Sequence, residues 1–224
     1  MKIFIAVPTY DSKTHIGTTT SLAAECALAA DLGVSVTLSF QPGMALVHSA
    51  RNLLCQRFLE SDATHLMFVD ADCGWDAGAV IRLCAKASEV ASQCVVAGVC
   101  RRRREPESYA LNFYNPTPPA VYDLIPVEAV GMAFACIHRQ TLEHFRHATP
   151  ERRYELDGEG LHAFFDSPIK DGFLWGEDFA FCNELRRVGG GVLIDPSITL
   201  RHLDGLNTYE GNLGRWLGIR EKAA

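Results

Sequence analysis

Two aspartates, Asp70 and Asp72, carry the strongest chemical signal in the sequence. They follow an apolar segment, 64–69, whose continuous hydrophobicity predicts a strand buried on both faces of a parallel sheet. Ligands of open α/β sheets bind at the carboxyl ends of strands, and alternation along an extended chain points both carboxylates the same way. Such a pair suits Mg²⁺ or Mn²⁺, which in turn hold phosphates. A turn that is merely acidic is the alternative.

A second acidic pair, Glu177 and Asp178, precedes a helical pattern over 178–188. The helix dipole favours ionised carboxylates at that end, so either residue is a candidate general base beside the irregular segment 148–176. The alternative is a pair of ordinary helix caps. His202 follows a strand-like segment and becomes a candidate metal ligand only if the fold brings it to Asp72.

The elements that must position these groups alternate between strand and helix through the first half of the chain. Strands are predicted at 2–7, 34–40, 64–69 and 94–100, and helices at 18–31, at 44–59 and after Asp76, which we expect to cap the third helix. This alternation predicts parallel pairing with right-handed crossovers.

After residue 104 the pattern changes. We expect proline-rich loops with short strands over 105–126, an apolar strand region at 127–137, helices at 140–146 and 178–188, and a last strand at 192–195. The segment 148–176 is expected to be irregular, as in a lid or a binding loop.

Composition bounds the class of protein. The 224 residues are 48% hydrophobic with a net charge of −6, which excludes a disordered chain and a protein that binds nucleic acid through its overall charge. We expect no membrane span and no signal peptide. The eight cysteines form no C-x-x-C pair, so we expect buried free thiols and a cytoplasmic location.

Five short segments, taken in order, resemble glycosyltransferases of the GT-A fold, in particular those of the family-2 type. They are AVPTYD at 6–11, SARN at 49–52, DAD at 70–72, WGED at 175–178 and RH at 201–202. The resemblance covers nearly the whole chain. It implies one domain over 1–224 with a GT-A-like, Rossmann-type α/β/α sandwich, mostly parallel with a smaller antiparallel part. Residues 1–104 would form the nucleotide-sugar half and 105–224 the acceptor half.

The resemblance also implies roles for individual residues. The donor would contact Pro8, Thr9, Tyr10, Asp11, Arg51, Asn52, Asp70 and Asp72. The metal ligands would be Asp72, His202 and Asp70, and the acceptor would lie beside Trp175, Gly131 and Met132. Asp178 would act as the general base and Glu177 would assist it.

The reaction expected from the resemblance is the metal-dependent transfer of a sugar, from a UDP- or GDP-sugar, to an acceptor hydroxyl. Mn²⁺ or Mg²⁺ would serve as the metal, and inversion is favoured over retention. The acceptor stays open between a glycan, a lipid and a nucleic-acid base, and self-association also stays open.

Two other enzyme classes fit less well. Haloacid-dehalogenase-type phosphatases also place two aspartates at a strand end, but on their first strand and with Thr or Val where this chain has Gly74. Sugar-nucleotide pyrophosphorylases place a Gly-rich loop with Arg after the first strand, where this chain has PTYDSKTH.

Two rival functions remain. One is a non-catalytic module that binds nucleotide sugars. The other is transfer to a hydroxymethylated DNA base, motivated by the run Arg101–Arg104. Together with Arg139, Arg146, Arg152 and Arg153 this run would form a basic patch that meets phosphates, or a solvated charge run.

Overall fold

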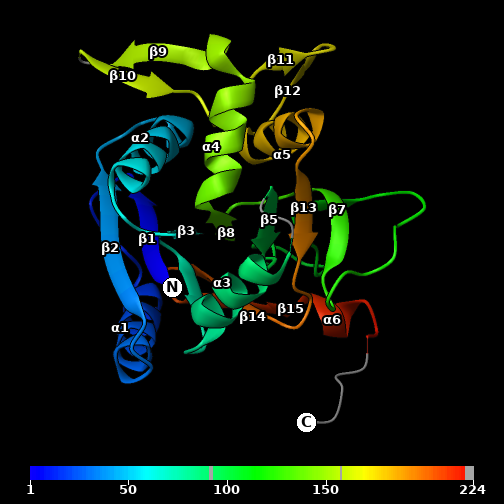
Figure 1. Ribbon diagram of the computed structural model, residues 1–224. Coiled ribbons are helices and arrows are strands. Elements are labelled where there is room, and N and C mark those ends of the chain that lie inside the picture. Colours follow the sequence, from blue (N-terminus) through cyan, green and yellow to red (C-terminus); the bar gives the residue numbers. More distant parts are fainter. Residues whose placement is uncertain (91–92, 157, 220–224) are drawn as a thin grey trace.

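The central sheet of the computed structural model has eight strands in the order β2-β1-β3-β8-β5-β13-β7-β6 (Figure 1). The structure describes residues 1–90, 93–156 and 158–219. Six of the eight strands point the same way, because only β8 and β7 run antiparallel to both of their neighbours. The strands are β1 (Lys2–Thr9), β2 (Ser35–Pro42), β3 (His65–Val69), β5 (Cys94–Ala97), β6 (Leu111–Phe113), β7 (Ile125–Val130), β8 (Phe134–His138) and β13 (Gly191–Ile194).

Helices cover both faces of this sheet. Figure 1 shows α2 (Val47–Glu60), α4 (Arg139–Ala148) and α5 (Glu177–Arg187) on one face, and α1 (Ile16–Asp31) and α3 (Ala79–Glu89) on the other. Alternate residues of β1 belong to different cores: Phe4 lies in the core that α2, α4 and α5 cover, whereas Ile5 lies in the core that α1 and α3 cover. The expected α/β/α sandwich is confirmed, and it has two apolar cores.

Strand β8 joins the two halves of the chain. It belongs to the second half in sequence, yet it lies between β3 and β5 and pairs with both. The apolar region predicted at 127–137 is therefore two strands, β7 and β8, which the small-residue segment 131–133 separates. Strand β5 ends at Ala97, which leaves 98–104 free to form a loop beside the site.

A smaller antiparallel sheet lies next to the ends of these strands. It contains β4 (Cys73–Trp75), β14 (Thr199–Asp204) and β15 (Asn207–Asn212), and α6 (Leu213–Trp216) follows it. The prediction that the strand at 192–195 is the last one is wrong, because β14 and β15 come after β13. Strand β14 pairs directly with β4, which follows the two aspartates of the strand end.

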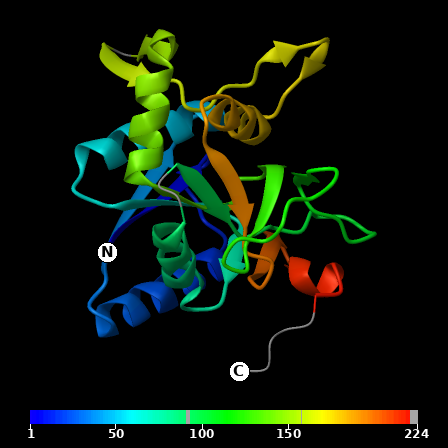
Figure 2. The ribbon, with the colours of Figure 1, turned by 45° about the vertical axis from the view of Figure 1, so that its right-hand side comes forward.

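Two hairpins occupy much of the segment that was expected to be irregular. They are β9 (Arg153–Leu156) with β10 (Glu159–His162), and β11 (Ile169–Lys170) with β12 (Phe173–Leu174); a 3₁₀ turn, Pro150–Arg152, precedes them. Both lie at the end of the molecule that also carries α4 and α5 (Figure 2). Their strands are short and largely exposed, so the sequence lacks the apolar alternation that predicts a strand.

The start of α3 differs from its prediction. Its N-cap is Gly78, at φ 92°, and not Asp76, whose carboxylate lies 2.9 Å from Nη1 of Arg201. The carboxylate of Glu25, fully buried in α1, accepts instead from the backbone N–H groups of Gly78 (2.8 Å) and Ile81 (3.0 Å). A carboxylate from another helix thus satisfies donors that the helix start leaves unpaired.

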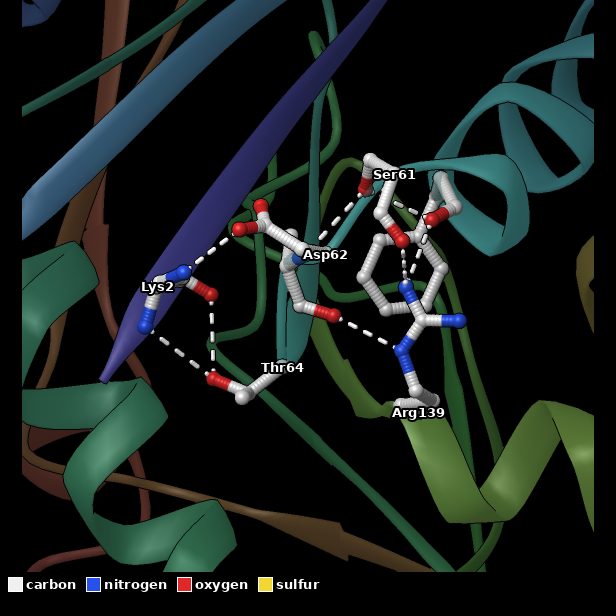
Figure 3. Close-up of polar contacts among 7 residues, drawn as sticks. Lys2, Ser61, Asp62, Thr64 and Arg139 are labelled. Atoms are coloured by element: carbon white, nitrogen blue, oxygen red, sulfur yellow. Dashed lines mark hydrogen bonds and ion pairs between the residues drawn. The ribbon is translucent and has the colours of Figure 1, made fainter.

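The end of α2 is fixed by Arg139, the first residue of α4 (Figure 3). Its guanidinium donates to the backbone oxygens of Phe58 (2.8 Å), Ser61 (2.7 Å) and Ala63 (2.8 Å). A cation at a helix C-terminus pairs with unsatisfied carbonyls and with the helix dipole. This contact holds α2, whose other end carries residues of the site described next.

Candidate functional site

A cavity of about 590 Å³ lies at the carboxyl ends of β1 and β3. Its volume is in the range of small-ligand sites. Six residues predicted to contact the donor line it: Pro8, Thr9, Tyr10, Asp11, Asp70 and Asp72. Tyr10 is 73% exposed, so its ring is free to cover a ligand, whereas Thr9 is buried and its hydroxyl has no hydrogen-bond partner in the described part of the chain.

The two strand-end aspartates are held by different arginines. Oδ1 of Asp70 lies 3.1 Å from Nη2 of Arg51, and Oδ2 of Asp72 contacts the guanidinium of Arg103. Both carboxylates are about one-third exposed, so they are accessible from the cavity. Each therefore has a cationic partner and also faces the space in which a ligand would lie.

Strand β14 brings His202 to this site, as the sequence alone could not show. In the register of the small sheet His202 is opposite Cys73, and the N–H of Leu203 donates to the carbonyl of Asp72 (2.8 Å). Nδ1 of His202 donates to the carbonyl of Arg101 (2.8 Å), because a carbonyl can only accept. In the neutral ring the lone pair is then on Nε2, which lies 3.8 Å from Oδ2 of Asp72.

This geometry allows a direct test of the expected metal site. Each ligand atom binds such a cation at about 2.1 Å, so two ligand atoms up to about 4.2 Å apart can share one. Nε2 of His202 and Oδ2 of Asp72 satisfy this limit. A metal-binding His usually donates a hydrogen bond from its other ring nitrogen, and the carbonyl of Arg101 accepts that bond here. Over the described ranges, however, no three His, Cys, Asp or Glu side chains converge as a preformed metal site. Asp72 and His202 fit a metal once Arg103 turns away, while Asp70 is directed towards Arg51.

Arg51 lies beneath the cavity and does not line it. Its side chain is 2% exposed and packs against the rings of Phe68 and Phe165. Its Nε lies 3.7 Å from a carboxylate oxygen of Glu177 and 3.7 Å from Oδ1 of Asp178. One buried cation therefore connects the strand-end aspartate to the acidic pair at the start of α5. Burial opposes its charge, but the three carboxylates outweigh burial and raise the pKa of Arg51.

Asp178, the predicted general base, is buried beside Arg51. Its Oδ1 is buried and has no hydrogen-bond partner among the described residues, and Nε and Nη1 of Arg51 are equally unpaired. Burial raises the pKa of Asp178 to about 7, against the opposing effect of Arg51, and the neighbouring Glu177 and Asp70 carboxylates raise it further. A carboxyl group that titrates near neutrality is matched to proton transfer at physiological pH.

The segment predicted to border the acceptor lies beside this carboxylate. A Cβ placed on Gly131 would lie 3.6 Å from Oδ2 of Asp178, and a backbone hydrogen bond from Met132 opposes the rise in the pKa of Asp178. Trp175 is half-buried at the end of the β11–β12 hairpin, where its backbone N–H donates to the carbonyl of Pro168 (3.0 Å). Gly131, Met132 and Trp175 thus belong to the segments around the acidic pair, and they do not line the donor cavity.

Asn52 is buried and has structural partners. Its amide exchanges two hydrogen bonds with the backbone of Phe165 (2.8 and 2.9 Å) and lies 3.4 Å from the hydroxyl of Tyr154. It therefore anchors the segment around the β9–β10 hairpin to α2. Like Arg51, it does not line the cavity.

The cavity also contains residues that the sequence analysis did not select. Lys13, His15 and the β14–β15 turn at 203–205 are among them. His15 caps α1 by accepting from the N–H of Gly17 (3.1 Å) at Nδ1, so its Nε2 donates to the carbonyl of Gly205 (2.9 Å). In the sequence, the position of His15 just before the start of a helix was the only feature that could have indicated its capping role.

The arginine run does not form one continuous basic face. Arg101 pairs with Glu105, Arg103 contacts Asp72 in the cavity, and Nε of Arg104 donates to Ser108 (3.1 Å). Arg103 and Lys13 are the cations on the cavity wall. The run therefore contributes one positive charge directly to the site.

No family model matches the sequence, and no curated protein matches it either. Solved structures do match the fold. A197 from STIV has 17% identity and a TM-score of 0.55, over 91% of this chain and 86% of that one. GalNAc-T7, solved with UDP, GalNAc and Mn²⁺, has 12% identity and a TM-score of 0.51, over 91% and 44%. TarS 1-349 from S. aureus has 14% identity and a TM-score of 0.50, over 87% and 58%.

These similarities establish that the chain has a GT-A-like fold. At such low identity they establish the fold alone. The chain spans less than two thirds of the GalNAc-T7 and TarS structures that it matches. In the described part of the chain, none of the helices has the length and apolar character that crossing a bilayer requires.

Proposed function

We propose that this chain is a glycosyltransferase that moves a sugar from a nucleotide-sugar donor to an acceptor hydroxyl. The observation that carries the proposal is the connection of two sites through Arg51. On one side is a cavity lined by the end of β1 and by Asp70 and Asp72, and on the other is the partly buried carboxylate of Asp178. The neighbour GalNAc-T7, solved with UDP, GalNAc and Mn²⁺, supports this choice of donor class.

The donor occupies the cavity at the ends of β1 and β3. Its nucleotide base lies against residues 8–11, where Tyr10 is free to stack on it. Its diphosphate lies towards Lys13 and Arg103, the cations of the cavity wall. We expect a UDP- or GDP-sugar.

A divalent cation belongs to this proposal. Asp72 and His202 hold it, with Asp70 as a further carboxylate once its contact with Arg51 is shared. When bound, Mn²⁺ or Mg²⁺ neutralises charge on the leaving diphosphate. Arg103 would have to release Oδ2 of Asp72 for a cation to lie between that carboxylate and His202.

The chain's own acid–base step uses Asp178. An acceptor hydroxyl that enters beside Trp175 gives its proton to the carboxylate of Asp178, while its oxygen forms the new bond to the anomeric carbon. The bond from that carbon to the diphosphate oxygen breaks, and the nucleoside diphosphate leaves with the electron pair. Attack opposite the leaving group inverts the configuration. Arg51 holds the carboxylate in place, and Glu177 assists by contacting the same guanidinium.

A donor-hydrolysis screen tests the proposal. The wild-type chain is incubated with UDP- and GDP-sugars and Mn²⁺ or Mg²⁺, and the released nucleoside diphosphate is measured. Asp72→Ala and chelation by EDTA are expected to abolish release from the preferred donor. Asp178→Asn is expected to abolish transfer while nucleotide binding persists.

The rival functions give different results in the same screen. A non-catalytic module would give nucleotide-induced thermal stabilisation without release from any donor. Transfer to a hydroxymethylated DNA base would give release that depends on duplex DNA, with binding that weakens steeply as salt increases. If no donor of the panel released nucleoside diphosphate and no nucleotide shifted the melting temperature, the proposal would be contradicted.

A further inference from the structure

A second cavity, of about 610 Å³, lies between α2, α4 and the β9–β10 hairpin. It is separate from the donor cavity, with which it shares no residue. Its lining consists of Gln56, Glu143, Arg146, His147, Pro150, Arg153, Gly160, Leu161 and His162. Its volume is that of a site for a small molecule.

Two unpaired arginines give this cavity a positive character. Within the described ranges, neither Arg146 nor Arg153 makes a side-chain hydrogen bond or an ion pair, although both line the cavity. Among the described residues of the lining, the carboxylate is that of Glu143, which lies 3.7 Å from Arg139, a cation outside the cavity. On a chain whose net charge is −6, two free guanidinium groups around one cavity favour an anionic ligand.

The wall of the cavity adds a neutral acceptor, His162, which is 3% exposed. The hydroxyl of Thr149 donates its only proton to the carbonyl of Phe145 (2.8 Å), so Nε2 of His162 must donate to that hydroxyl (3.0 Å). Nδ1 therefore carries the lone pair, and it is buried with no partner among the described residues. Burial, reinforced by nearby arginines, lowers the pKa of His162 to about 4, so the ring stays uncharged at neutral pH.

We propose that this cavity binds a phosphate-bearing carbohydrate. The phosphate lies between Arg146 and Arg153, and hydroxyl groups donate to acceptors such as Nδ1 of His162. A second acceptor is Oε1 of Gln56, whose amide nitrogen is already used in a bond to Glu60 (2.7 Å). The ligand must therefore combine an anion with hydroxyl donors, as a sugar phosphate or a polyol phosphate does.

The position of the cavity gives the ligand a role that rests on the proposed function. Gln56 lies one helical turn along α2 from Asn52, the neighbour of Arg51 in the sequence. Asn52 also fixes the segment that carries the cavity's hairpin. A remote phosphate-bearing unit of the acceptor would thus bind here while its reacting hydroxyl lies near Asp178.

The lining argues against nucleic acid as the ligand. Its described residues include no Phe, Tyr or Trp side chain on which a base could stack. Proteins that bind single-stranded nucleic acid rely on such stacking together with a basic groove. A compact cavity with hydrogen-bonding groups is better suited to one carbohydrate unit.

Titration calorimetry of the full chain, without any nucleotide sugar, tests the proposal. The ligands are hexose and pentose phosphates, the matching unphosphorylated sugars, inorganic phosphate and a single-stranded oligonucleotide. A sugar phosphate is expected to bind at least tenfold more tightly than its unphosphorylated form and than inorganic phosphate. The double variant Arg146→Gln/Arg153→Gln is expected to lose at least tenfold of this affinity.

Arg215→Gln is the matched control. Arg215 belongs to α6, at the opposite end of the molecule from the β9–β10 hairpin (Figure 1), and it is more than half exposed. This variant should bind like the wild type, and circular dichroism checks that all variants are folded. Equal binding of inorganic phosphate, binding of the oligonucleotide alone, or no binding at all would each overturn the proposal. Because no donor is present, these outcomes are independent of the donor-hydrolysis screen.

Discussion

Nε of Arg51 lies 3.7 Å from Oδ1 of Asp178, and neither atom has a hydrogen-bond partner among the described residues. The same guanidinium reaches Asp70 at 3.1 Å through Nη2. One buried cation is therefore placed between the predicted base and the donor cavity. A change at either side alters the electrostatic environment of the other, because the interior screens charge weakly.

Removal of this cation should destabilise the fold. Arg51→Gln leaves the carboxylates of Asp70, Glu177 and Asp178 without their shared partner, and breaking such a buried contact costs about 3–5 kcal/mol. Urea denaturation followed by circular dichroism measures the change. Arg57→Gln, at an exposed position of the same helix, is expected to stay within about 0.5 kcal/mol of the wild type. Equal effects of the two substitutions would contradict the assignment of Arg51 as the central cation.

Activity should rise with pH through about 7. Asp178 accepts a proton only when it is ionised, and burial raises its pKa to about 7, so kcat/KM should increase as pH passes that value.

The free energy of unfolding should change with pH in the opposite sense. The folded state holds the proton of Asp178 over a range in which the unfolded state, with an ordinary pKa near 4, has lost it, so stability falls as pH rises from about 4 to about 7. A pH–rate profile and urea titrations at several pH values measure both, and Asp178→Asn should lose both dependences.

Metal binding should depend on the residue pair that β14 brings together. Asp72→Ala or His202→Ala removes one of two ligand atoms, and we expect Mn²⁺ affinity to fall at least tenfold in titration calorimetry without donor. Arg103→Gln should strengthen Mn²⁺ binding, because it frees the oxygen that the cation needs. His48→Ala, outside this pair, serves as the control. Weaker binding in Arg103→Gln would show that the arginine does not compete with the metal.

The buried carboxylate of Glu25 should be critical to the stability of the α3 layer. It accepts from Nε1 of Trp75 (3.0 Å) and from the backbone of Gly78 and Ile81. In Glu25→Gln one of these donors meets an amide NH₂ group, and a lost hydrogen bond to a buried charge costs about 1.5–3 kcal/mol. Thermal and urea denaturation check this value. Glu89→Gln, exposed at the end of α3, should be almost neutral.

The layers of the fold could be predicted from the sequence for a physical reason, whereas the residues expected around the cavity came mainly from the resemblance of short segments to a known family. Helical and strand periodicities report burial, and the buried strand ahead of Asp70 is the clearest case. Glu25 could not be assigned in this way. Its partners lie on another helix and a distant strand, and local pattern favoured Asp76 as the cap.

The placement of Arg51 was beyond the sequence for a similar reason. On α2 its side chain can point either to the cavity or beneath it, and the surrounding rings of Phe68 and Phe165 decide the outcome. The hairpins after α4 also escaped prediction, because their strands are two to four residues long and mostly exposed.

The place of β8 between β3 and β5 has a consequence for synthesis of the chain on the ribosome. Until residues 134–138 have emerged, β3 and β5 each present an unpaired edge made of apolar residues. Open edges of that kind invite pairing with other chains. We therefore expect a nascent chain that stalls before this point, or a truncated one, to be prone to aggregation.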